Sequence, residues 1–505
     1  MDEVNGWGWQ HATDQQRIDL AEKILDHAFD VIRPQGILIV QAFLAQAISS
    51  AALFQLEMGL LDVVRAIGRL IMQAVVQSLE PDTAVTLPRN VWFECGGYRR
   101  RSDRTFNRSI ATRFGNITLR RTGYRSWVRG EETIFPLEQM LGLTQNVSPA
   151  MLSWIGQITA AAGMSQQTTI RMIREQTTVP LGVKRLRACT KVLADRLEPL
   201  RQTCQVDALL SMLETAKHSS GSRKPVLCVG RDGITLRQRA SYFEVATAGT
   251  VSVYDRAGKR LGTVYLAHPP EPGQASMDQM ITSLLEELFE RWTGPLPRLA
   301  YVTDSGSNEV DYFRRVLKTM KHPVTGSPLS WTRVADFYHV SERVWAIADA
   351  LFTQAEQQQA AAWARRMLKK LKRPSGASRV LHSAAALLSR RQLGKARLKN
   401  YRNAYRYLQK RTAYLKYHDY KKLHIPLGSG VTEAACKTIF TQRLKLSGQR
   451  WTHEGVGRIL TLRTILLSNT WDATYHANLS RNQPTLRTYT KKPPATAKLT
   501  PQITP

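Results

Sequence analysis

Three acidic residues stand where short apolar segments end, and together they could bind metal ions. Asp232 follows the run VLCVGR, Asp304 follows RLAYVT, and Glu433 lies in GSGVTEAACKT, where a helix is expected to begin. If the two runs are neighbouring strands, both aspartates project from adjacent positions at one edge of a sheet. Two such charges about 4 Å apart repel by about 4 kcal/mol at an effective dielectric constant near 20, so the pair favours a bound proton or cation. Oxygen ligands suit Mg²⁺ or Mn²⁺.

Each acid also has an ordinary structural interpretation. A lone aspartate often ends a strand or starts a turn, and a carboxylate in the first turn of a helix, as expected for Glu433, is stabilised by the helix dipole. Cations follow Glu433, however, and would suit a phosphate that passes a metal site: Arg443, Lys445 and Arg450 beside Trp451. Two metal ions held by three carboxylates can activate an attacking oxygen and stabilise a leaving oxygen on either side of a phosphodiester.

The elements that must position these acids have an alternating α/β pattern between about residues 224 and 344. β-Branched runs predict three strands, with a hairpin turn at Asp255-Arg-Ala-Gly258. An amphipathic helix with Ser276 as its cap follows, then the strand RLAYVTDSGS, another helix, and a fifth strand in WTRVADFYHV. Three antiparallel strands followed by helix, strand, helix and strand are the order of an α/β RNase H-like fold with a mixed five-stranded sheet.

The segments VGRDG, YVTDSGSN, DFYHV and GSGVTEAACKTIFTQRLKLSGQRW together resemble the DDE transposases of bacterial insertion sequences, in particular the ISKra-like group, and more distantly the mutator-like transposases. The resemblance covers about residues 224 to 472. It implies that Asp232, Asp304 and Glu433 are the metal-binding triad. It also implies that Asp336 and His339 form an Asp-x-x-His signature, with the histidine near the scissile phosphate. Without the resemblance, His339 would be read as a core histidine.

The spacing of the acids indicates an insertion. Asp304 and Glu433 are 129 residues apart, against 72 for Asp232 and Asp304, and the extra length has a helical pattern. Residues 361–423 contain 19 Lys or Arg and one acid, a net +18 of the chain's formal +31. Tyrosines 401, 405 and 407 alternate with Arg402 and Arg406. A charge run is usually a solvated face, but the lack of compensating acids favours a segment that lies along DNA.

The composition of the whole chain also points to a polyanionic partner. The 505 residues include 71 Lys or Arg against 40 Asp or Glu, while 43% are hydrophobic, as in a folded protein. The five cysteines include no CxxC pair, which argues against a disulfide framework and against a cysteine zinc site and favours a reducing compartment. The residues MDEVNGWGWQ do not read as a signal peptide. The uncharged stretch 34–56 is interrupted by glutamines and serines, so a buried or dimerising helix is expected there, not a membrane span.

The segments before the α/β region are expected to bind DNA or to dimerise. Residues 14–79 have helical periodicity. Residues 90–133 alternate arginines with β-branched and aromatic residues, which predicts a small basic sheet that is either solvated or in contact with DNA. The break at Gly163-Met164, followed by Ser165 as an N-cap, predicts a helix-turn-helix. Its second helix would present four residues to the major groove: Gln166, Gln167, Thr169 and Arg171.

The sequence thus predicts a multidomain protein. The expected parts are an N-terminal helical region (1–89), a β-rich basic segment (90–147), a helix-turn-helix-like region (148–222), a first part of the catalytic core (223–350), a basic helical insertion (351–425), a second part of the core (426–476) and a disordered tail (477–505).

The leading hypothesis is a transposase that binds the terminal inverted repeats of an insertion sequence. With two Mg²⁺ ions (or Mn²⁺), it would cleave each element end and join the released 3′-hydroxyl to target DNA. Arg443, Lys445 and Arg450 would grip the DNA backbone. The expected partners are double-stranded DNA and a second copy, as a homodimer or higher synaptic oligomer, in the cytoplasm of a bacterium at the nucleoid. The alternatives are a metal-dependent RNase H-like nuclease or resolvase without strand transfer, and a DNA-binding protein with a vestigial catalytic centre.

Overall fold

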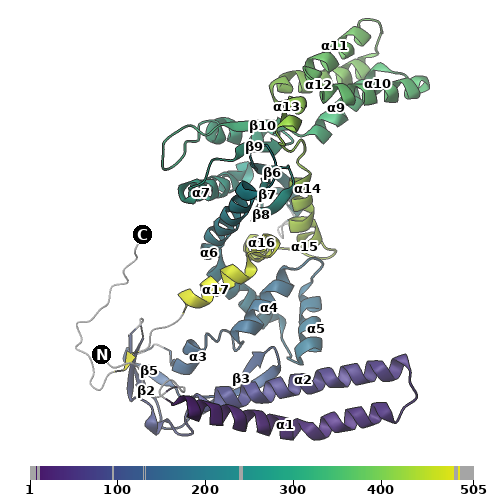
Figure 1. The fold of residues 1–505 in the computed structure, drawn as a ribbon. Helices are drawn as coiled ribbons and strands as arrows, with labels where there is room; N and C mark the ends of the chain where they lie inside the picture. The colour runs from purple at the N-terminus through teal and green to yellow at the C-terminus, as the bar shows by residue number, and fades with distance from the viewer. Residues whose placement is uncertain are drawn as a thin grey trace. The chain divides into compact units, whose positions relative to one another are not determined.

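The computed structural model describes Trp7 and residues 12–93, 96–128, 130, 132–237, 243–482 and 487–488. The chain divides into two compact units (Figure 1). The first unit comprises residues 1–159, 165–193 and 475–505, and the second comprises residues 160–164 and 194–474. Each unit is described by itself below.

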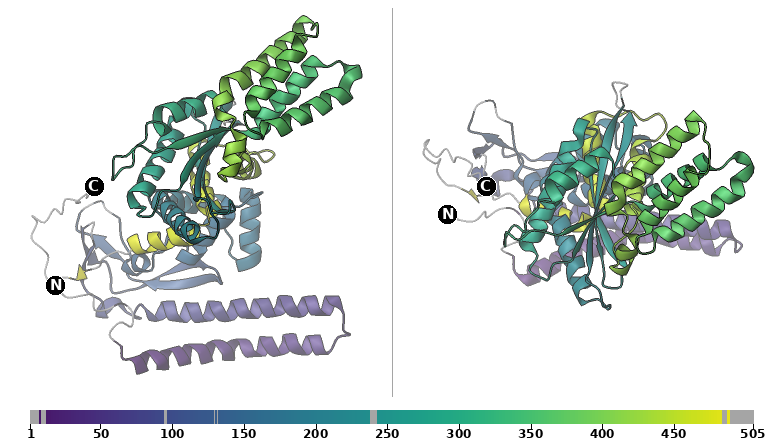
Figure 2. Two further views of the ribbon diagram at one scale, coloured as in Figure 1. Left: turned by 45° about the horizontal axis from the view of Figure 1, so that its top comes forward. Right: turned by 90° about the horizontal axis from the view of Figure 1, so that it is seen from above.

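The first unit begins with a hairpin of two long helices, α1 (Asp14–Leu44) and α2 (Ser50–Ser78), which pack side by side (Figures 1 and 2). Thr13 caps α1 with its side chain and exchanges hydrogen bonds with Gln16 in a capping box. The Ser49 side chain caps α2 by accepting the amide hydrogen of Ala52. The uncharged stretch 34–56 is therefore divided between two helices. Among the described residues, no helix has the length and apolar character needed to span a membrane.

The β-rich part of the first unit confirms the predicted small sheet. A four-stranded sheet has the order β11-β1-β2-β5, and β3 pairs with β4 in a separate hairpin. Gly115 opens β4 with φ 116°, a conformation that favours glycine. The strands are β1 (Asn90–Phe93), β2 (Gly96–Arg100), β3 (Phe106–Thr112), β4 (Gly115–Arg121), β5 (Tyr124–Ser126) and β11 (Arg487–Thr488).

Four helices follow this sheet along the chain. They are α3 (Pro136–Met140), α4 (Pro149–Ala160), α5 (Gln166–Thr177) and the long α6 (Val183–His218), whose later part belongs to the second unit. The predicted break between α4 and α5 is confirmed: Gly163 has φ 71°, and the Ser165 hydroxyl accepts the amide hydrogen of Thr168 at 3.0 Å.

The second unit contains a mixed five-stranded sheet, as the sequence predicts. Its order is β10-β9-β6-β7-β8; β6 is parallel to β9 and antiparallel to β7, and β9 is parallel to β10. The turn at Asp255 is also as predicted, because its carboxylate accepts the amide hydrogens of Ala257 and Lys259. The strands are β6 (Val226–Arg237), β7 (Phe243–Tyr254), β8 (Arg260–His268), β9 (Arg298–Thr303) and β10 (Trp331–Ala335).

Helices cover both faces of this sheet. Successive side chains of a strand point to opposite faces, so each strand contributes residues to two apolar cores. Leu227 and Val229 pack with α6, α7 (Ala275–Arg291) and the helical segment formed by α8 (Ser307–Tyr312) and the π-helical turn η3 (Phe313–Leu317). Val226 and Cys228 face the opposite side, toward α9 (Phe337–Leu351).

The helical insertion is confirmed. After α9 it contains α10 (Gln357–Leu371), α11 (Gly376–Leu388), α12 (Lys395–Arg411) and α13 (Tyr417–Lys422), whose apolar faces share one core with β6, β9 and β10. The chain then returns to the sheet through α14 (Gly430–Cys436), the π-helical turn η6 (Lys437–Thr441) and α15 (Gln442–Leu444). The last helices are α16 (His453–Leu467) and α17 (Trp471–Arg481).

Three local predictions are wrong. DFYHV does not continue the fifth strand, because the Asp336 carboxylate accepts the amide hydrogens of Tyr338 and His339 and thereby caps α9. Ser276 does not cap α7, since its hydroxyl donates to Glu271 and the helix begins at Ala275. Within the expected tail, α17 extends to Arg481 and residues 487–488 pair with β1; residues 483–486 and 489–505 lie outside the described residues.

Candidate active site

Strands β6 and β9 bring two of the three predicted acids to neighbouring positions. Gly230 of β6 lies opposite Val302 of β9, so the parallel register carried two residues further places Asp232 opposite Asp304. Cys228 of β6 and Val302 of β9 face the α9 side of the sheet. Asp232 and Asp304 follow them at even spacing along each strand, so both aspartates lie on that same face. Since adjacent strands are about 4.8 Å apart, the two carboxylates lie side by side where the pairing of β6 with β9 ends. Asp304 directly follows β9, as predicted, whereas β6 does not end at Asp232 but continues to Arg237, where it still pairs with β7.

Asp232 is half-buried, and its surroundings oppose its negative charge. Burial is the main cause of its raised pKa. The amide of Gly233 (2.7 Å) and the thiol of Cys436 donate hydrogen bonds that lower the pKa, but the charges of Asp304 and Glu433 raise it again. The third predicted acid therefore acts electrostatically on the first.

Helix α14 delivers Glu433 to this edge because it packs closely on β6. The hydroxyl of Thr432 bonds to that of Thr250 on β7 at 2.7 Å. A Cβ atom added at Gly230 would lie only 2.0 Å from Oγ1 of Thr432, so glycine is required for this approach. Cys436, one turn later in α14, packs in the core beneath the helix. A glycine two residues before Asp232 thus sets the distance between β6 and the helix that carries Glu433.

His339 and Asp336 lie at the same end of the sheet and have different roles. Nε2 of His339 is 3.6 Å from Oε1 of Glu433, and its Nδ1 is 3.3 Å from Glu342. Asp336 is buried, and its carboxylate also accepts hydrogen bonds from the backbone and hydroxyl of Ser429, the latter at 2.5 Å. Asp336 therefore joins the start of α9 to the segment that precedes α14, while His339 faces the carboxylates.

Sequence reasoning missed a buried ionic group on the opposite face of the sheet. Arg231, directly before Asp232, is fully buried and pairs with Asp278 of α7, with Glu309 of α8 at 3.9 Å, and with the Gln274 side chain at 2.8 Å. Burial raises the pKa of Glu309, and the charge of Asp304 raises it further. An arginine beside an aspartate in an otherwise apolar strand was the available signal, since a buried cation requires an acidic partner.

The insertion contributes a second group that sequence reasoning missed. The Tyr407 hydroxyl of α12 donates to the carbonyl oxygen of Asp304 at 3.0 Å, and the Arg411 guanidinium donates to that of Ser305 at 2.8 Å. Arg411 also lies over the Tyr407 ring, 3.7 Å from its centroid. Ser305 has φ 67°, so these bonds hold a strained loop directly after β9.

The predicted phosphate-binding cations after Glu433 do not share one environment. Lys445 and Arg450 are exposed, as phosphate binding requires. Arg443 is only 1% exposed, and burial together with the nearby charge of Arg463 lowers its pKa to about 10, so in this conformation it cannot grip a phosphate. Trp451 is half-buried, and its indole N–H donates to the carbonyl of Leu444 at 3.1 Å.

The cations of the insertion lie mostly on its surface. Of the 19 Lys and Arg in residues 361–423, all within the described part of the chain, 15 are exposed, including Arg402 and Arg406. The tyrosines that alternate with these arginines in the sequence are less exposed than the arginines. Tyr401 is buried and stacks on Tyr405 with centroids 5.5 Å apart, because the apolar face of α12 packs into the core.

Two of the four predicted base-reading residues of α5 are exposed. Gln167 and Arg171 point to solvent, and Arg171 pairs with Glu175 at 3.8 Å. Thr169 is fully buried, so it cannot reach DNA, and Gln166 accepts hydrogen bonds from Arg187.

The donor set of the three acids fits a hard cation in its chemistry. Within the described ranges, no group of three or more His, Cys, Asp or Glu side chains is already gathered as a metal site. The observation that favours a cation is electrostatic: Asp304 and Glu433 both disfavour the charge on a half-buried Asp232, and a divalent cation would offset that repulsion.

Comparison with known proteins adds no assignment. No family model and no curated protein sequence matches the chain. The positions of Asp232, Asp304, Glu433 and His339 are therefore the basis for a functional proposal.

Proposed function

We propose that this chain is a DNA transposase with an RNase H-like catalytic core of the DDE type. One observation carries the proposal: Asp232 and Asp304 lie on neighbouring strands where the parallel pairing of β6 with β9 ends, and a helix packed on the same face brings Glu433 close enough to raise the pKa of Asp232. The sheet order, with β6 central and antiparallel to β7, supports the RNase H-like assignment.

Asp232, Asp304 and Glu433 would hold two Mg²⁺ or Mn²⁺ ions, and such ions would stabilise charge on the attacking and leaving oxygens of a phosphodiester. In the first step, water attacks the phosphorus at an element end and the 3′-oxygen leaves. In the second step, the released 3′-hydroxyl attacks a target phosphodiester and the 3′-oxygen of the target strand leaves. His339, with Nε2 toward Glu433, donates a hydrogen bond to an oxygen of the phosphate.

The DNA contacts follow from exposed charge. Lys445 and Arg450 lie on the segment that follows α14, and the cations of the insertion, among them Arg402 and Arg406, bind further along the backbone. Gln167 and Arg171 of α5 contact bases.

The N-terminal hairpin of α1 and α2 forms a homodimer in this proposal. Among the described residues, 16 of the 24 large hydrophobic side chains classed as exposed lie between Ile18 and Val75. With roughly 90 Å² exposed on each, they present about 1,400 Å² of apolar area, more than the ~800 Å² per partner that a specific interface buries. Residues 14–78 carry 7 acids and 5 cations in a chain of net +31, so this hairpin suits a protein partner better than DNA.

Light scattering tests the dimer. The wild-type protein should have twice the mass of one chain, and the variant Leu53→Glu with Phe54→Glu should have the mass of a single chain.

The experiment that tests the proposal uses duplex DNA from the regions that flank the coding sequence. The full-length protein should cleave these ends in the presence of Mg²⁺ and join them to a target plasmid. Asp232→Asn, Asp304→Asn and Glu433→Gln should each lower cleavage by at least about 10²-fold and leave DNA binding unchanged, because they remove only charge at the reacting site. Asp349→Asn, an exposed aspartate of α9, is the matched control and should cleave normally.

The outcomes separate the alternatives. Cleavage without joining would indicate a nuclease or resolvase. Specific binding without Mg²⁺-dependent cleavage by the wild-type protein would indicate a vestigial catalytic centre. Normal cleavage by Asp232→Asn would remove Asp232 from the mechanism.

A further inference from the structure

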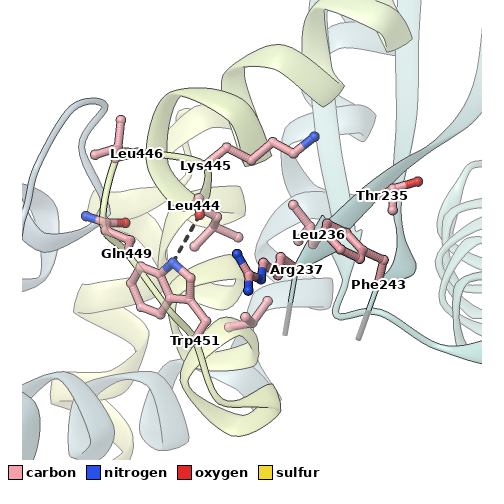
Figure 3. Close-up of a pocket in the computed structure, with 10 residues that line it drawn as sticks. Thr235, Leu236, Arg237, Phe243, Leu444, Lys445, Leu446, Gln449 and Trp451 are labelled. Atoms are coloured by element: carbon pink, nitrogen blue, oxygen red, sulfur yellow. Dashed lines mark hydrogen bonds between the residues drawn. The ribbon is translucent and has the colours of Figure 1, made fainter. Parts of the chain in front are cut away.

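A pocket of about 370 Å³ opens beside the candidate active site, where β6 ends and the chain leaves α15 (Figure 3). Its floor is apolar, with Leu236 and Leu444 among the lining residues. Trp451 and Phe243 provide aromatic rings, and Arg237 and Lys445 provide cations. This volume lies at the lower end of the range of small-molecule sites and suits one nucleotide.

The aromatic side chains of the pocket are presented for contact. Phe243 is 66% exposed, so its ring is open to a partner. The Arg237 guanidinium lies 6.0 Å from the centroid of this ring. The hydrogen bond from the Trp451 indole to Leu444 fixes the orientation of the second ring. Rigid rings of this kind stack on the faces of nucleobases.

The polar groups of the pocket match the remaining parts of a nucleotide. Arg237 and Lys445 are both exposed, and no carboxylate occurs among the residues found to line the pocket, so the rim favours a phosphate. Within the described residues, Oε1 of Gln449 is buried and accepts no hydrogen bond. A base edge that carries an N–H group would supply the missing donor.

The pocket lies within reach of the reacting phosphate. Thr235 and Arg237, which line it, follow Asp232 on the same strand by three and five residues. At about 3.3 Å per residue this is roughly 10 to 16 Å, a few nucleotides along a strand.

We propose that this pocket receives one nucleobase that is unstacked from the element end close to the cleavage point. The base stacks on Trp451 and Phe243 and bonds to Gln449, and its phosphate binds Lys445 and Arg237. The inference rests on the proposed function, and it adds a contact that holds the strand in place at the active site.

The test is a double-mutant cycle between the protein and the DNA. End duplexes that each carry one abasic site, at successive positions on both sides of the cleavage point, are titrated against the full-length protein with Ca²⁺ in place of Mg²⁺. One position should weaken binding by about 5- to 100-fold, the range expected for one stacked base. Phe243→Ala, which is safe for folding because the ring is exposed, and Trp451→Leu should weaken binding of the intact duplex. Neither variant should add to the effect of that abasic site.

The controls separate this proposal from the function on which it rests. Val324→Ala, at a residue 67% exposed in a loop of the same unit, should leave the cycle unchanged. Lys445→Ala should weaken binding of the intact and abasic duplexes equally, because it removes a phosphate contact. Specific binding with no position coupled to Phe243 would overturn the pocket assignment and leave the transposase proposal standing. Absence of specific binding to any end duplex would overturn both, and binding of free dAMP as tight as that of the end duplex would indicate a nucleotide site unrelated to DNA.

Discussion

Burial, hydrogen bonding and the charges of neighbouring acids all affect the pKa of Asp232. Its pKa is raised in the folded chain, first by burial and then by the charges of Asp304 and Glu433. A group of this kind stabilises the fold when it is protonated, and that contribution is lost as the pH rises from the ordinary carboxylate range through the raised pKa. At neutral pH, Asp232 therefore costs stability unless a cation binds.

The first prediction is that Asp232→Asn is more stable than the wild-type protein in EDTA at pH 7.5. The expected gain is about 0.5 to 1 kcal/mol, or roughly 1–3 °C in Tm. The gain should shrink as the pH falls through the raised pKa of Asp232, because the wild-type carboxylate then takes up a proton. Added Mg²⁺ should raise the Tm of the wild type more than that of the variant. Scanning calorimetry measures both effects, and equal Mg²⁺ shifts would count against a metal ligand at Asp232.

Gly230 controls the site without any functional group of its own. The second prediction is that Gly230→Ala displaces α14, because the new Cβ would lie 2.0 Å from Thr432 Oγ1. The expected cost is about 1–3 kcal/mol in stability, with at least a tenfold loss of cleavage. Gly430→Ala, in α14 itself, has nothing within 4 Å of its added Cβ and is the control.

Removal of the clashing hydroxyl should partly reverse this loss. Gly230→Ala combined with Thr432→Ala should recover stability and cleavage relative to Gly230→Ala alone. The added Cβ would also lie 2.8 Å from Oγ1 of Thr250, so Thr250→Ala is added in a third variant. Failure of both multiple variants to recover either property would show that the contact with α14 is not the cause.

At the scale of elements, α12 joins the insertion to the loop that carries Asp304. The third prediction is that Tyr407→Phe lowers the cleavage rate several-fold without changing DNA affinity, because one hydrogen bond worth about 1 kcal/mol is lost at the Asp304 carbonyl. Adding Arg411→Gln, which removes the bond to Ser305, should lower the rate further. Single-turnover cleavage at saturating DNA measures the rate. Tyr405→Phe, on the same helix, should behave as wild type; a loss of affinity in Tyr407→Phe would point instead to a DNA contact.

The elements themselves were largely predictable. Apolar and β-branched runs predicted β6 to β9. The pairing of β6 with β9, which places Asp232 opposite Asp304, was only a condition of the sequence prediction, because the pattern of a strand does not say which strand it pairs with. The start of α9 was not predictable from its apolar and aromatic pattern, which suits a strand as well as a helix. The helix begins there because Asp336 caps it, and Asp336 is held in place by Ser429, which is distant in the sequence.

The burial of Arg443 and Arg463 was beyond sequence reasoning. Arg463 donates at 2.8 Å to the carbonyl of Thr438, which lies in the π-helical turn η6, and so occupies the interior beside Arg443. The sequence gives no sign that the carbonyl of Thr438 can accept this bond, because that depends on the π-helical backbone and not on the residue type. Tyr407 escaped notice for the same reason, since its partner is a backbone oxygen 103 residues away in the chain.

At the scale of the whole molecule, the charge is concentrated where the fold leaves it exposed. Residues 361–423 carry +18 of the chain's +31. The fourth prediction is that DNA affinity falls steeply with salt, and that the variant Arg402→Gln, Arg406→Gln, Lys410→Gln lowers the slope of log K against log salt by roughly 2–3, at about 0.9 per phosphate contact.

Three exposed cations of α1 provide the matched control: Arg17→Gln, Lys23→Gln and Arg33→Gln remove the same charge from a helix that we do not place on DNA. Fluorescence anisotropy from 50 to 300 mM salt measures both slopes. An equal reduction in the two triple variants would mean that net charge alone, and not the insertion, governs the affinity.

The most direct test of the central claim counts metal ions at the three carboxylates. Mn²⁺ binding to the complex of full-length protein with end DNA is measured by electron paramagnetic resonance. The wild type and Asp349→Asn should each bind two ions per active site, and Asp232→Asn, Asp304→Asn and Glu433→Gln should each lose at least one. Undiminished Mn²⁺ binding in all three variants would contradict the account.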